Sequence, residues 1–288
     1  MPNLTHDPAP SLAQLLAFYL EAGVDCALMD EPVNRLADID TAPARAAPDP
    51  ESGDAPKRPT LASMQPGVPA RPAMPPKIEI APEVAIAAAR EAARAAPTLA
   101  ALRDLMETFE GCALKSTATQ LVFADGNPQA RIMFVGEAPG RDEDIEGLPF
   151  VGQAGKLLDK MLAAIGLDRS HVYISNLIAW RPPGNRNPTP QETQICVPFI
   201  QRHIELVNPD ILVTLGNPAT QTLLQTKDGI MKSRGRWVDY DTGTRTIRAI
   251  GSFHPEYLLL SPSYKRLAWQ DLRSIAVAMQ ASSGRTTT

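Results

Sequence analysis

The 288-residue sequence has little cysteine and no long apolar run, and each shortage excludes a class of protein. The three cysteines, Cys26, Cys112 and Cys196, are too few and too scattered for a disulfide framework, so we expect a protein of the reducing cytoplasm. No stretch approaches the roughly eighteen apolar residues of a membrane span, and the N-terminal residues lack a basic-then-apolar signal pattern. We therefore expect no membrane partner.

A strong charge of either sign is also lacking, since the whole chain has a net charge of -4. The charge is unevenly distributed: residues 1–109 hold 9 Lys/Arg against 15 Asp/Glu, whereas residues 110–288 hold 19 against 17. The slightly basic C-terminal part permits a nucleic-acid-binding groove but does not demand one.

Composition divides the chain into three zones. Residues 1–30 contain one amphipathic pattern, SLAQLLAFYLEAG, which predicts an N-terminal helical segment. Residues 31–80 hold 11 of the 28 prolines and little apolar periodicity, which predicts a flexible linker. Residues 81–288 form the predicted folded domain, with two Ala-rich helices at 81–108, separated at Pro97, and a core at 109–280.

The core has the pattern of an α/β fold. Apolar strand candidates at 130–136, 172–178, 211–216 and 246–252 alternate with helical patterns at 155–165, 190–207 and 217–225, and a further helix follows at 264–279. Continuous apolar strands between helices favour a parallel sheet covered on both faces. Such a sheet binds its ligand at the carboxyl ends of its strands.

Three polar side chains follow predicted strands at this edge: Glu137, Asn176 and His254. The carboxyl ends of parallel strands meet at one edge, so we expect these residues to converge. An acid, an amide and an imidazole suit recognition of a planar polar heterocycle, on which Phe150 could stack.

Each of these signals has a purely structural alternative. GEAPG (136–140) is also compatible with a tight turn, His254 with a structural hydrogen bond, and Asn176 with a turn or cap. The acidic residues 142–144 predict a solvent-facing loop. Only their common position in the predicted sheet favours a site.

Three longer motifs together resemble the family-4 branch of the uracil-DNA glycosylase superfamily. They are GEAPGRDEDIEGLPFVGQAGKLLDKMLAAIGLDR (136–169), VYISNLIAWRPPGNRNPTPQE (172–192) and FHPEYLL (253–259). The resemblance implies a three-layer α/β/α sandwich with a central four-stranded parallel sheet. It also implies a monofunctional DNA glycosylase that flips uracil out of DNA and hydrolyses its N-glycosidic bond, leaving an abasic site for base-excision repair.

The resemblance assigns a role to each pocket residue. Glu137 would stabilise the sugar cation and orient water, and His254 would hydrogen-bond the leaving uracil. Asn176 would recognise the base edge and Phe150 would stack on the ring. The rest of the uracil pocket would be lined at Gly136, Ala138 and Glu143.

DNA contacts are expected from two segments. In the loop expected at 256–266, after the catalytic histidine, Leu258, Leu259 or Leu260 would fill the gap left by the extruded base, unless these leucines belong to the core. The residues predicted to contact DNA are Arg181, Arg186, Leu259, Ser261, Lys265 and Arg266. The partner would be single- or double-stranded uracil-containing DNA, bound by a monomer in a cytoplasmic, nucleoid-associated setting of bacterial type.

The sequence departs from the family at its iron–sulfur ligands. Relatives hold a [4Fe–4S] cluster with four cysteines, whereas the matching positions here are Phe109, Cys112, Trp180 and Cys196. Two thiolates do not securely hold a cluster that normally takes four. We therefore predict no metal and no cofactor, with the two aromatic side chains filling the space of the cluster.

Two other functions remain open at this point. One is a non-catalytic relative that binds uracil or abasic sites in DNA, and the other is a glycosidase of small nucleosides. The N-terminal helix could also serve to bind a repair or replication partner.

Overall fold

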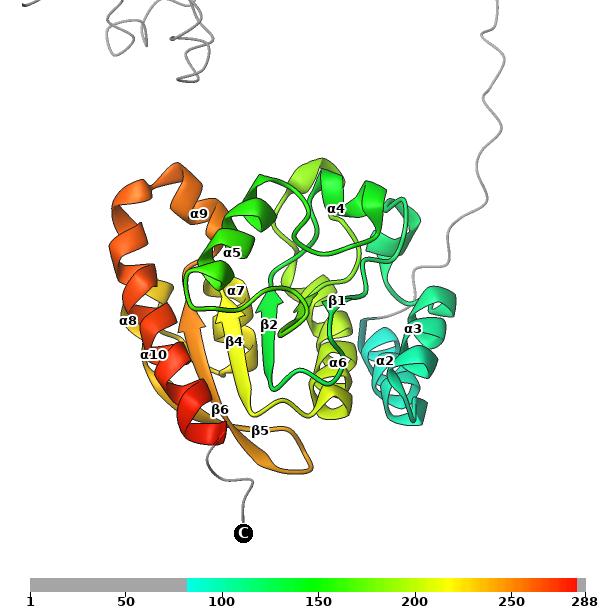
Figure 1. The fold of residues 1–288 in the computed structure, drawn as a ribbon. Helices are drawn as coiled ribbons and strands as arrows, with labels where there is room; N and C mark the ends of the chain where they lie inside the picture. Colours follow the sequence, from blue (N-terminus) through cyan, green and yellow to red (C-terminus); the bar gives the residue numbers. More distant parts are fainter. Residues whose placement is uncertain (1–81, 284–288) are drawn as a thin grey trace, which may run out of the picture. The chain divides into compact units, whose positions relative to one another are not determined.

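A six-stranded sheet lies at the centre of residues 82–283, the part of the chain that the computed structural model describes (Figure 1). The strand order is β1-β3-β2-β4-β6-β5; the four inner strands are parallel, and β1 and β5 pair antiparallel at the two edges. The strands are β1 Asp125–Gly126, β2 Ile132–Gly136, β3 Tyr173–Asn176, β4 Ile211–Leu215, β5 Trp237–Asp241 and β6 Thr246–Ser252.

Helices lie on both faces of this sheet. The longer ones are α2 Pro82–Ala95, α3 Leu99–Thr108, α5 Gln153–Ala163, α6 Pro190–Val207 and α10 Lys265–Ser283. The shorter ones are α4 Arg141–Glu146, α7 Asn217–Leu223, α8 Ile230–Ser233 and α9 Pro255–Leu260, with 3-10 turns at Ala113–Ser116, Pro183–Asn185 and Pro262–Tyr264. Among the described helices, none is both long and apolar enough to cross a membrane.

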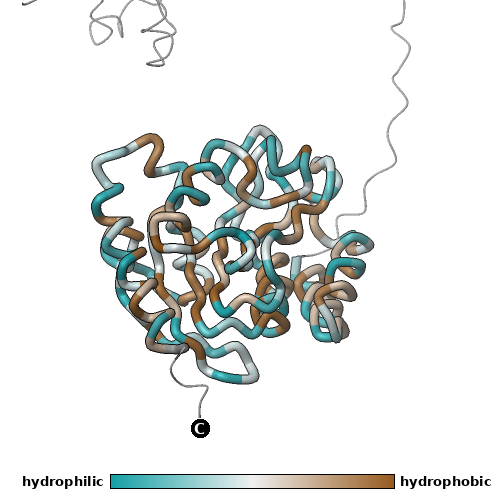
Figure 2. Tube along the Cα trace, viewed as in Figure 1, coloured by the Kyte–Doolittle hydropathy of each residue, from teal (hydrophilic) through white to brown (hydrophobic). Residues whose placement is uncertain are grey.

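Alternation along the inner strands builds two cores. In β2, Ile132 and Phe134 join the cluster that includes α5 and α10 residues, while Met133 and Val135 join the cluster that includes α2, α3 and α6 residues. Every residue of β2, β3 and β4 is buried, because a parallel strand covered on both faces has no solvent side. The apolar residues of these strands lie at the centre of Figure 2.

The predicted parallel strands are confirmed, but the sheet is wider than expected. Strand β5, with the sequence WVDYD, is a largely exposed edge strand, so it lacks the apolar run by which buried strands are recognised. Strand β1 has only two residues and leaves no periodic pattern. The predicted N-terminal helix and linker lie outside the described residues.

Two segments expected to be loops are helical instead. The acidic stretch at 142–144 belongs to α4, and Asp144 is only 2% exposed because its carboxylate accepts hydrogen bonds from the backbone N–H and hydroxyl of Thr119, each at 2.8 Å. The stretch after His254 begins with α9, since Pro255 suits the first helical position and the His254 ring caps it. The prediction of a solvent-facing acidic loop is therefore wrong for Asp144.

Candidate active site

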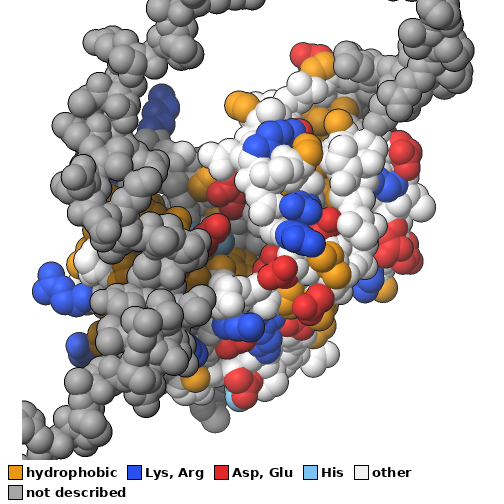
Figure 3. Space-filling view, turned by 90° about the horizontal axis from the view of Figure 1, so that it is seen from above, with side chains coloured by type: hydrophobic (Ala, Val, Ile, Leu, Met, Phe, Trp, Pro, Cys, Tyr) orange, Lys and Arg blue, Asp and Glu red, His pale blue; other side chains and the backbone are white. Residues whose placement is uncertain are grey.

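The carboxyl ends of the parallel strands bring the predicted pocket residues to one edge of the sheet. Gly136 of β2 pairs in register with Asn176 of β3, and Leu215 of β4 pairs with Ser252 of β6, two residues before His254. The molecule is hollowed on this side, as Figure 3 shows from above. The hollow contains two adjoining cavities of about 490 and 360 Å³.

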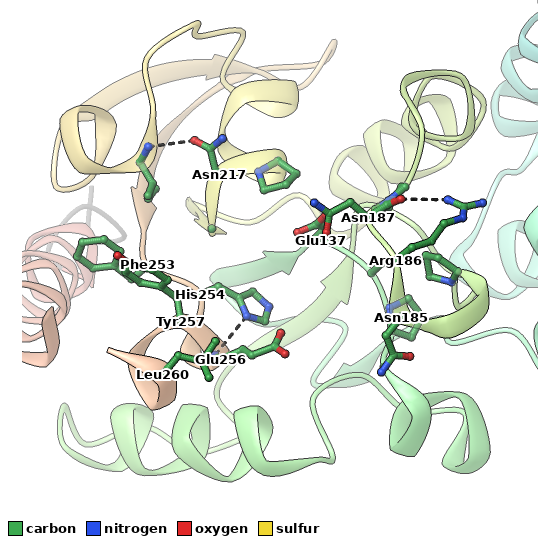
Figure 4. A pocket seen from close by; sticks show the side chains of 18 residues that line it. Glu137, Asn185, Arg186, Asn187, Asn217, Phe253, His254, Glu256, Tyr257 and Leu260 are labelled. Atoms are coloured by element: carbon green, nitrogen blue, oxygen red, sulfur yellow. Dashed lines mark hydrogen bonds between the residues drawn. The ribbon is translucent and has the colours of Figure 1, made fainter. Parts of the chain in front are cut away.

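The two cavities divide the predicted residues between them. Glu137 lines the larger cavity (Figure 4), and Phe150 and Asn176 line the smaller one. His254 and Ala138 line both. An acid, an imidazole, an amide and an aromatic ring therefore surround one continuous hollow, as the sequence predicted.

Close contact between strand and loop requires glycine at position 136. A Cβ atom there would lie 2.5 Å from Asn176 Oδ1 and 2.6 Å from Phe150 Cζ, both far inside van der Waals contact. The Asn176 amide and the Phe150 ring therefore approach each other across the bare backbone of Gly136.

Phe150 is held in an unusual backbone conformation. Its φ is 56°, which lies in the left-handed region that residues other than glycine seldom adopt. Arg169 donates to the carbonyl oxygens of Phe150 and Pro149 and forms an ion pair with Asp125. A Cβ at Gly155 would lie 1.6 Å from the Phe150 carbonyl oxygen, so this glycine is also needed. These contacts fix the ring where it lines the smaller cavity.

Glu143 shapes this loop from within. Its carboxylate accepts backbone N–H bonds from Gly140 at 3.1 Å, Val151 at 3.1 Å and Gly152 at 3.0 Å. The side chain therefore ties the start of α4 to the segment after Phe150, while Glu143 also lines the smaller cavity.

The side chain of Asn176 contains a buried acceptor, Oδ1, that forms no hydrogen bond within the described residues. Its side chain is 5% exposed, and Oδ1 is the buried side-chain polar atom without a hydrogen-bond partner among residues 82–283. Leaving a buried acceptor unpaired costs about 1–3 kcal/mol, so such an atom calls for an explanation. A ligand N–H donor in the smaller cavity would satisfy it.

Glu137 is a half-buried carboxyl beside a second acid. Burial raises the pKa of Glu137 above its ordinary value, and the charge of Glu256 raises it further. A raised pKa brings a carboxylate closer to the range in which it accepts a proton from water at neutral pH.

His254 is arranged as a neutral hydrogen-bond donor. Burial lowers the pKa of His254 to about 4, so the ring is uncharged near neutrality. Its Nδ1 accepts the backbone N–H of Glu256 at 3.3 Å, which leaves the ring proton on Nε2. In Figure 4 the ring lies between the side chains of Glu137 and Glu256. Its centroid is 5.4 Å from that of Phe150.

Of the leucines after His254, one is core and two are exposed. Leu258 is 1% exposed and packs with Phe253, which agrees with the core alternative for this residue. Leu259 and Leu260 are 41% and 78% exposed, and both line the smaller cavity.

The polar residues predicted to contact DNA differ in their hydrogen bonds to the protein and in their exposure. Arg181 donates to Asn185 Oδ1 at 2.6 Å, and Arg186 makes two bonds to the Glu192 carboxylate at 2.6 and 2.8 Å. Lys265 and Arg266 are exposed at the start of α10, and Ser261 is half-buried after α9.

Among the residues of the hollow that were missed from the sequence are Asn217, Glu256 and Tyr257, which all line the larger cavity. A signal for Asn217 was present, because it follows β4 and every inner parallel strand ends at the same edge. Glu256 and Tyr257 lie on α9, and their segment was treated as a DNA-contacting loop rather than as a cavity wall.

The cysteine region does not fit a four-thiolate cluster. Cys112 and Cys196 are buried free thiols, and the described residues contain no group of three or more His, Cys, Asp or Glu placed to hold a metal. At the other two matching positions, Trp180 is 1% exposed and Phe109 packs edge-on against Phe199 with ring centroids 5.0 Å apart. Trp180 and Phe199 belong to the same hydrophobic cluster as the two cysteines, and Phe109 packs against it.

Comparison with known proteins identifies the class to which this fold and site belong. The model of the uracil DNA glycosylase superfamily matches residues 123–273, which include all the strand ends described above. The class is therefore that superfamily.

Similar proteins narrow the assignment. A type-4 uracil-DNA glycosylase from Archaeoglobus fulgidus is 41% identical over 178 residues, covering 60% of this chain and 89% of that protein. Type-4 enzymes from Saccharolobus solfataricus and Thermotoga maritima are 37% and 42% identical, covering 62% and 56% of this chain and 86% and 84% of their own lengths. The chain belongs to the type-4 uracil-DNA glycosylase family.

Proposed function

We propose that the smaller cavity binds a uracil extruded from DNA and that Glu137 and His254 hydrolyse its N-glycosidic bond across the boundary of the two cavities. As a member of this family, the protein is a uracil-DNA glycosylase, a hydrolase of N-glycosidic bonds that initiates base-excision repair. The observation that supports the site most is the unpaired Oδ1 of Asn176, buried in a cavity beside an aromatic ring.

Uracil suits the smaller cavity because its edge complements the Asn176 amide. Oδ1 would accept the N3–H of the base, and the amide NH2 would donate to O4. Cytosine presents an acceptor at N3 and a donor at C4. Its N3 would therefore face the acceptor Oδ1, and its amine would face the donor NH2 of Asn176. Phe150 would support the ring by stacking.

Bond cleavage divides charge between the sugar and the base. As the bond from C1′ to N1 breaks, the electron pair leaves with uracil and the sugar becomes cationic. His254 Nε2–H would donate to the oxygen on which the negative charge develops, without itself being charged. Glu137 would stabilise the cation, orient water toward C1′ and accept its proton.

DNA would enter across the exposed side of α9 and the following turn. The exposure of Leu259 and Leu260 on the rim supports one of them as the side chain that fills the vacated stack. Ser261, Lys265 and Arg266 follow directly and would contact phosphates. Arg181 and Arg186 would act from the facing loop, where their ion pairs to Asp144 and Glu192 compete with a phosphate.

We also propose that this enzyme works without the iron–sulfur cluster of its family. Trp180 and Phe109 replace two ligands with rings that cannot bind iron, and the buried packing around Cys196 supports a structural role for this region. Iron and sulfide analysis of anaerobically purified protein tests this, and stoichiometric iron with the visible absorption of a cluster would contradict it. The Phe109→Cys/Trp180→Cys double variant, which restores the ligand set, serves as the comparison.

A cleavage assay tests the activity directly. Single-stranded and duplex oligonucleotides containing one uracil are incubated with the protein, and abasic sites are revealed by alkaline strand cleavage. We expect cleavage at uracil that declines steeply with salt, because DNA binding displaces counterions. Binding without alkali-labile products would indicate a non-catalytic protein, and release of uracil from free deoxyuridine at comparable efficiency would indicate a nucleoside hydrolase.

A further inference from the structure

The larger cavity is not explained by a uracil bound in the smaller one. Asn176 and Phe150 do not line it, yet at about 490 Å³ it is the roomier of the two. Glu137 and His254 line it, so it adjoins the place where the glycosidic bond would lie if the proposed function holds. Because the DNA strand is continuous, a nucleotide next to the uridine would lie near this cavity.

One wall of the larger cavity is apolar and aromatic. Phe253, Tyr257 and Leu260 form it on the side of α9, opposite the loop that contains Asn185 (Figure 4). Tyr257 is 39% exposed, so part of its side chain is accessible to a ligand in this cavity. Exposed aromatic surface beside a catalytic group indicates a binding surface.

The Tyr257 ring is held in place by two further rings. It stacks on Phe253 with centroids 5.6 Å apart and an interplanar angle of 23°, and lies 5.4 Å from Tyr264. Phe253 is fully buried and is itself 5.4 Å from Tyr264. A ring fixed in this way loses little conformational entropy when a ligand stacks on it.

The charges around the larger cavity favour a neutral ligand over a phosphate. Among the described residues that line it, the carboxylates are Glu137 and Glu256, and the Lys/Arg group is Arg186, whose guanidinium is bonded to Glu192. The loop opposite Tyr257 contributes the amides of Asn185 and Asn187. A planar group with a π face and hydrogen-bonding edges, such as a nucleobase, matches both walls.

We propose that the larger cavity binds the nucleobase adjacent to uracil on the same strand, with Tyr257 as its stacking surface. A base in single-stranded DNA is free to turn into the cavity, whereas a base in a duplex must first leave its own pair and stack. The subsite therefore contributes more to excision from single strands than from duplexes. Stacking on an aromatic side chain is sequence-tolerant, so any of the four bases is accepted.

The experiment removes either the nucleobase next to uracil or the aromatic ring of Tyr257. Single-stranded oligonucleotides carry one uracil and, in separate substrates, an abasic analogue immediately 5′ or 3′ of it. For the wild-type protein, loss of the base on one of these sides lowers kcat/KM by about fivefold to a hundredfold, the value of one stacked base. Tyr257→Ala lowers kcat/KM on the intact substrate by a similar factor and makes it insensitive to that base.

Control variants separate stacking from other effects of the substitution. Tyr257→Phe keeps the ring and retains the response to the neighbouring base, and Tyr257→Leu keeps apolar packing without a π face and loses it. Trp269→Ala removes another exposed aromatic ring, 42% exposed on α10 and outside both cavities, and leaves excision unchanged.

Two outcomes would overturn the subsite. One is a wild-type protein indifferent to base loss on both sides, and the other is a Tyr257→Leu variant that responds to base loss as the wild type does. A wild-type protein that excises no uracil from any oligonucleotide would instead refute the proposed function of the whole pocket, so the two failures are distinguishable.

Discussion

Strand β3 runs from the interior beside α6 to the pocket at its carboxyl end, and the two regions differ in whether buried polar groups have hydrogen-bond partners. In its first half, the Tyr173 hydroxyl is bonded to His203 Nε2 at 2.8 Å, and the His203 ring stacks on Phe123 at 4.4 Å. At its last residue, Asn176 Oδ1 has no protein partner, and Glu137, which follows the register partner Gly136, has a pKa raised by burial. The interior between β3 and α6 satisfies these polar groups with protein partners, whereas the pocket leaves Asn176 Oδ1 unpaired, as expected of the substrate site that we propose.

The difference separates residues of the interior, which stabilise the fold, from residues of the pocket, to which we assign the chemistry. Trp180 and Cys196 lie in the same core cluster as Tyr173, and both are buried. Pocket residues are kept in arrangements that cost free energy, such as the positive φ of Phe150. Substitutions in the interior should therefore reduce stability, and substitutions in the pocket should reduce activity.

The largest expected effect is on stability, from Trp180→Ala. Removing a large buried aromatic side chain costs about 3–5 kcal/mol of unfolding free energy, from lost burial and the cavity left behind. Chemical denaturation followed by circular dichroism measures this, and the folded fraction should still excise uracil. A loss below about 1 kcal/mol would mean that Trp180 does not support the interior, because cavity formation alone exceeds that value.

Next in size is the loss of activity in His254→Ala. Removing one donor to a developing oxyanion costs about 10²- to 10³-fold in rate. Single-turnover excision measures the rate, and titration with uracil-containing DNA measures binding, which should change much less. Equal losses in binding and rate would assign His254 to DNA binding instead. The denaturation midpoint of this variant should stay near that of wild type, in contrast with Trp180→Ala.

Asn176→Asp changes which base is accepted. The aspartate lacks the amide donor for uracil O4, and its carboxylate accepts from the exocyclic amine of cytosine. Correctly paired edge contacts are worth about 1–3 kcal/mol of discrimination, so the ratio of cytosine to uracil excision should rise by about tenfold or more. Oligonucleotides with a single uracil or cytosine measure the ratio. An unchanged ratio would remove base recognition from Asn176.

Much of this arrangement was accessible from the sequence because it depends on short-range patterns. Apolar runs located all four inner strands, and α6 has the predicted bounds because Thr189 and Glu192 form a capping box around Pro190. The parallel topology then placed Glu137, Asn176 and His254 at one edge. Phe150 was predicted as a stacking residue from the residue pattern, and motif resemblance assigned it the same role. Its position depends on the Arg169 contacts and on Gly155 rather than on any periodicity.

The features that could not be predicted from the sequence depend on contacts between residues that only folding brings together. The burial of Asp144 follows from Thr119, a residue 25 positions earlier in the chain. The exposed edge strand β5 is defined by pairing with β6 and not by its own hydropathy. The aromatic wall of the larger cavity combines Phe253 after β6 with Tyr257 on α9. Tyr264 in the next turn packs behind these two rings, and only the folded chain brings the three together.

The smallest effect we expect is a shift in pH dependence from Glu256→Gln. Burial is the main cause of the raised pKa of Glu137, and the negative charge of Glu256 adds to it. The mechanism that we propose requires ionised Glu137, so the rate should fall as pH drops through this pKa. Removing the charge of Glu256 makes ionisation easier and lowers the pKa, so the acid limb of the rate profile moves to lower pH.

Single-turnover rates across the acid range measure this shift for Glu256→Gln and for a matched control. Glu146→Gln removes an exposed carboxylate from the end of α4 outside both cavities, and its acid limb should coincide with that of wild type. A shift to higher pH in Glu256→Gln, or no shift at all, would show that Glu256 does not act on Glu137 through its charge. Because both carboxylates line the larger cavity, a shift to lower pH would show that a charge within this cavity influences the ionisation of Glu137.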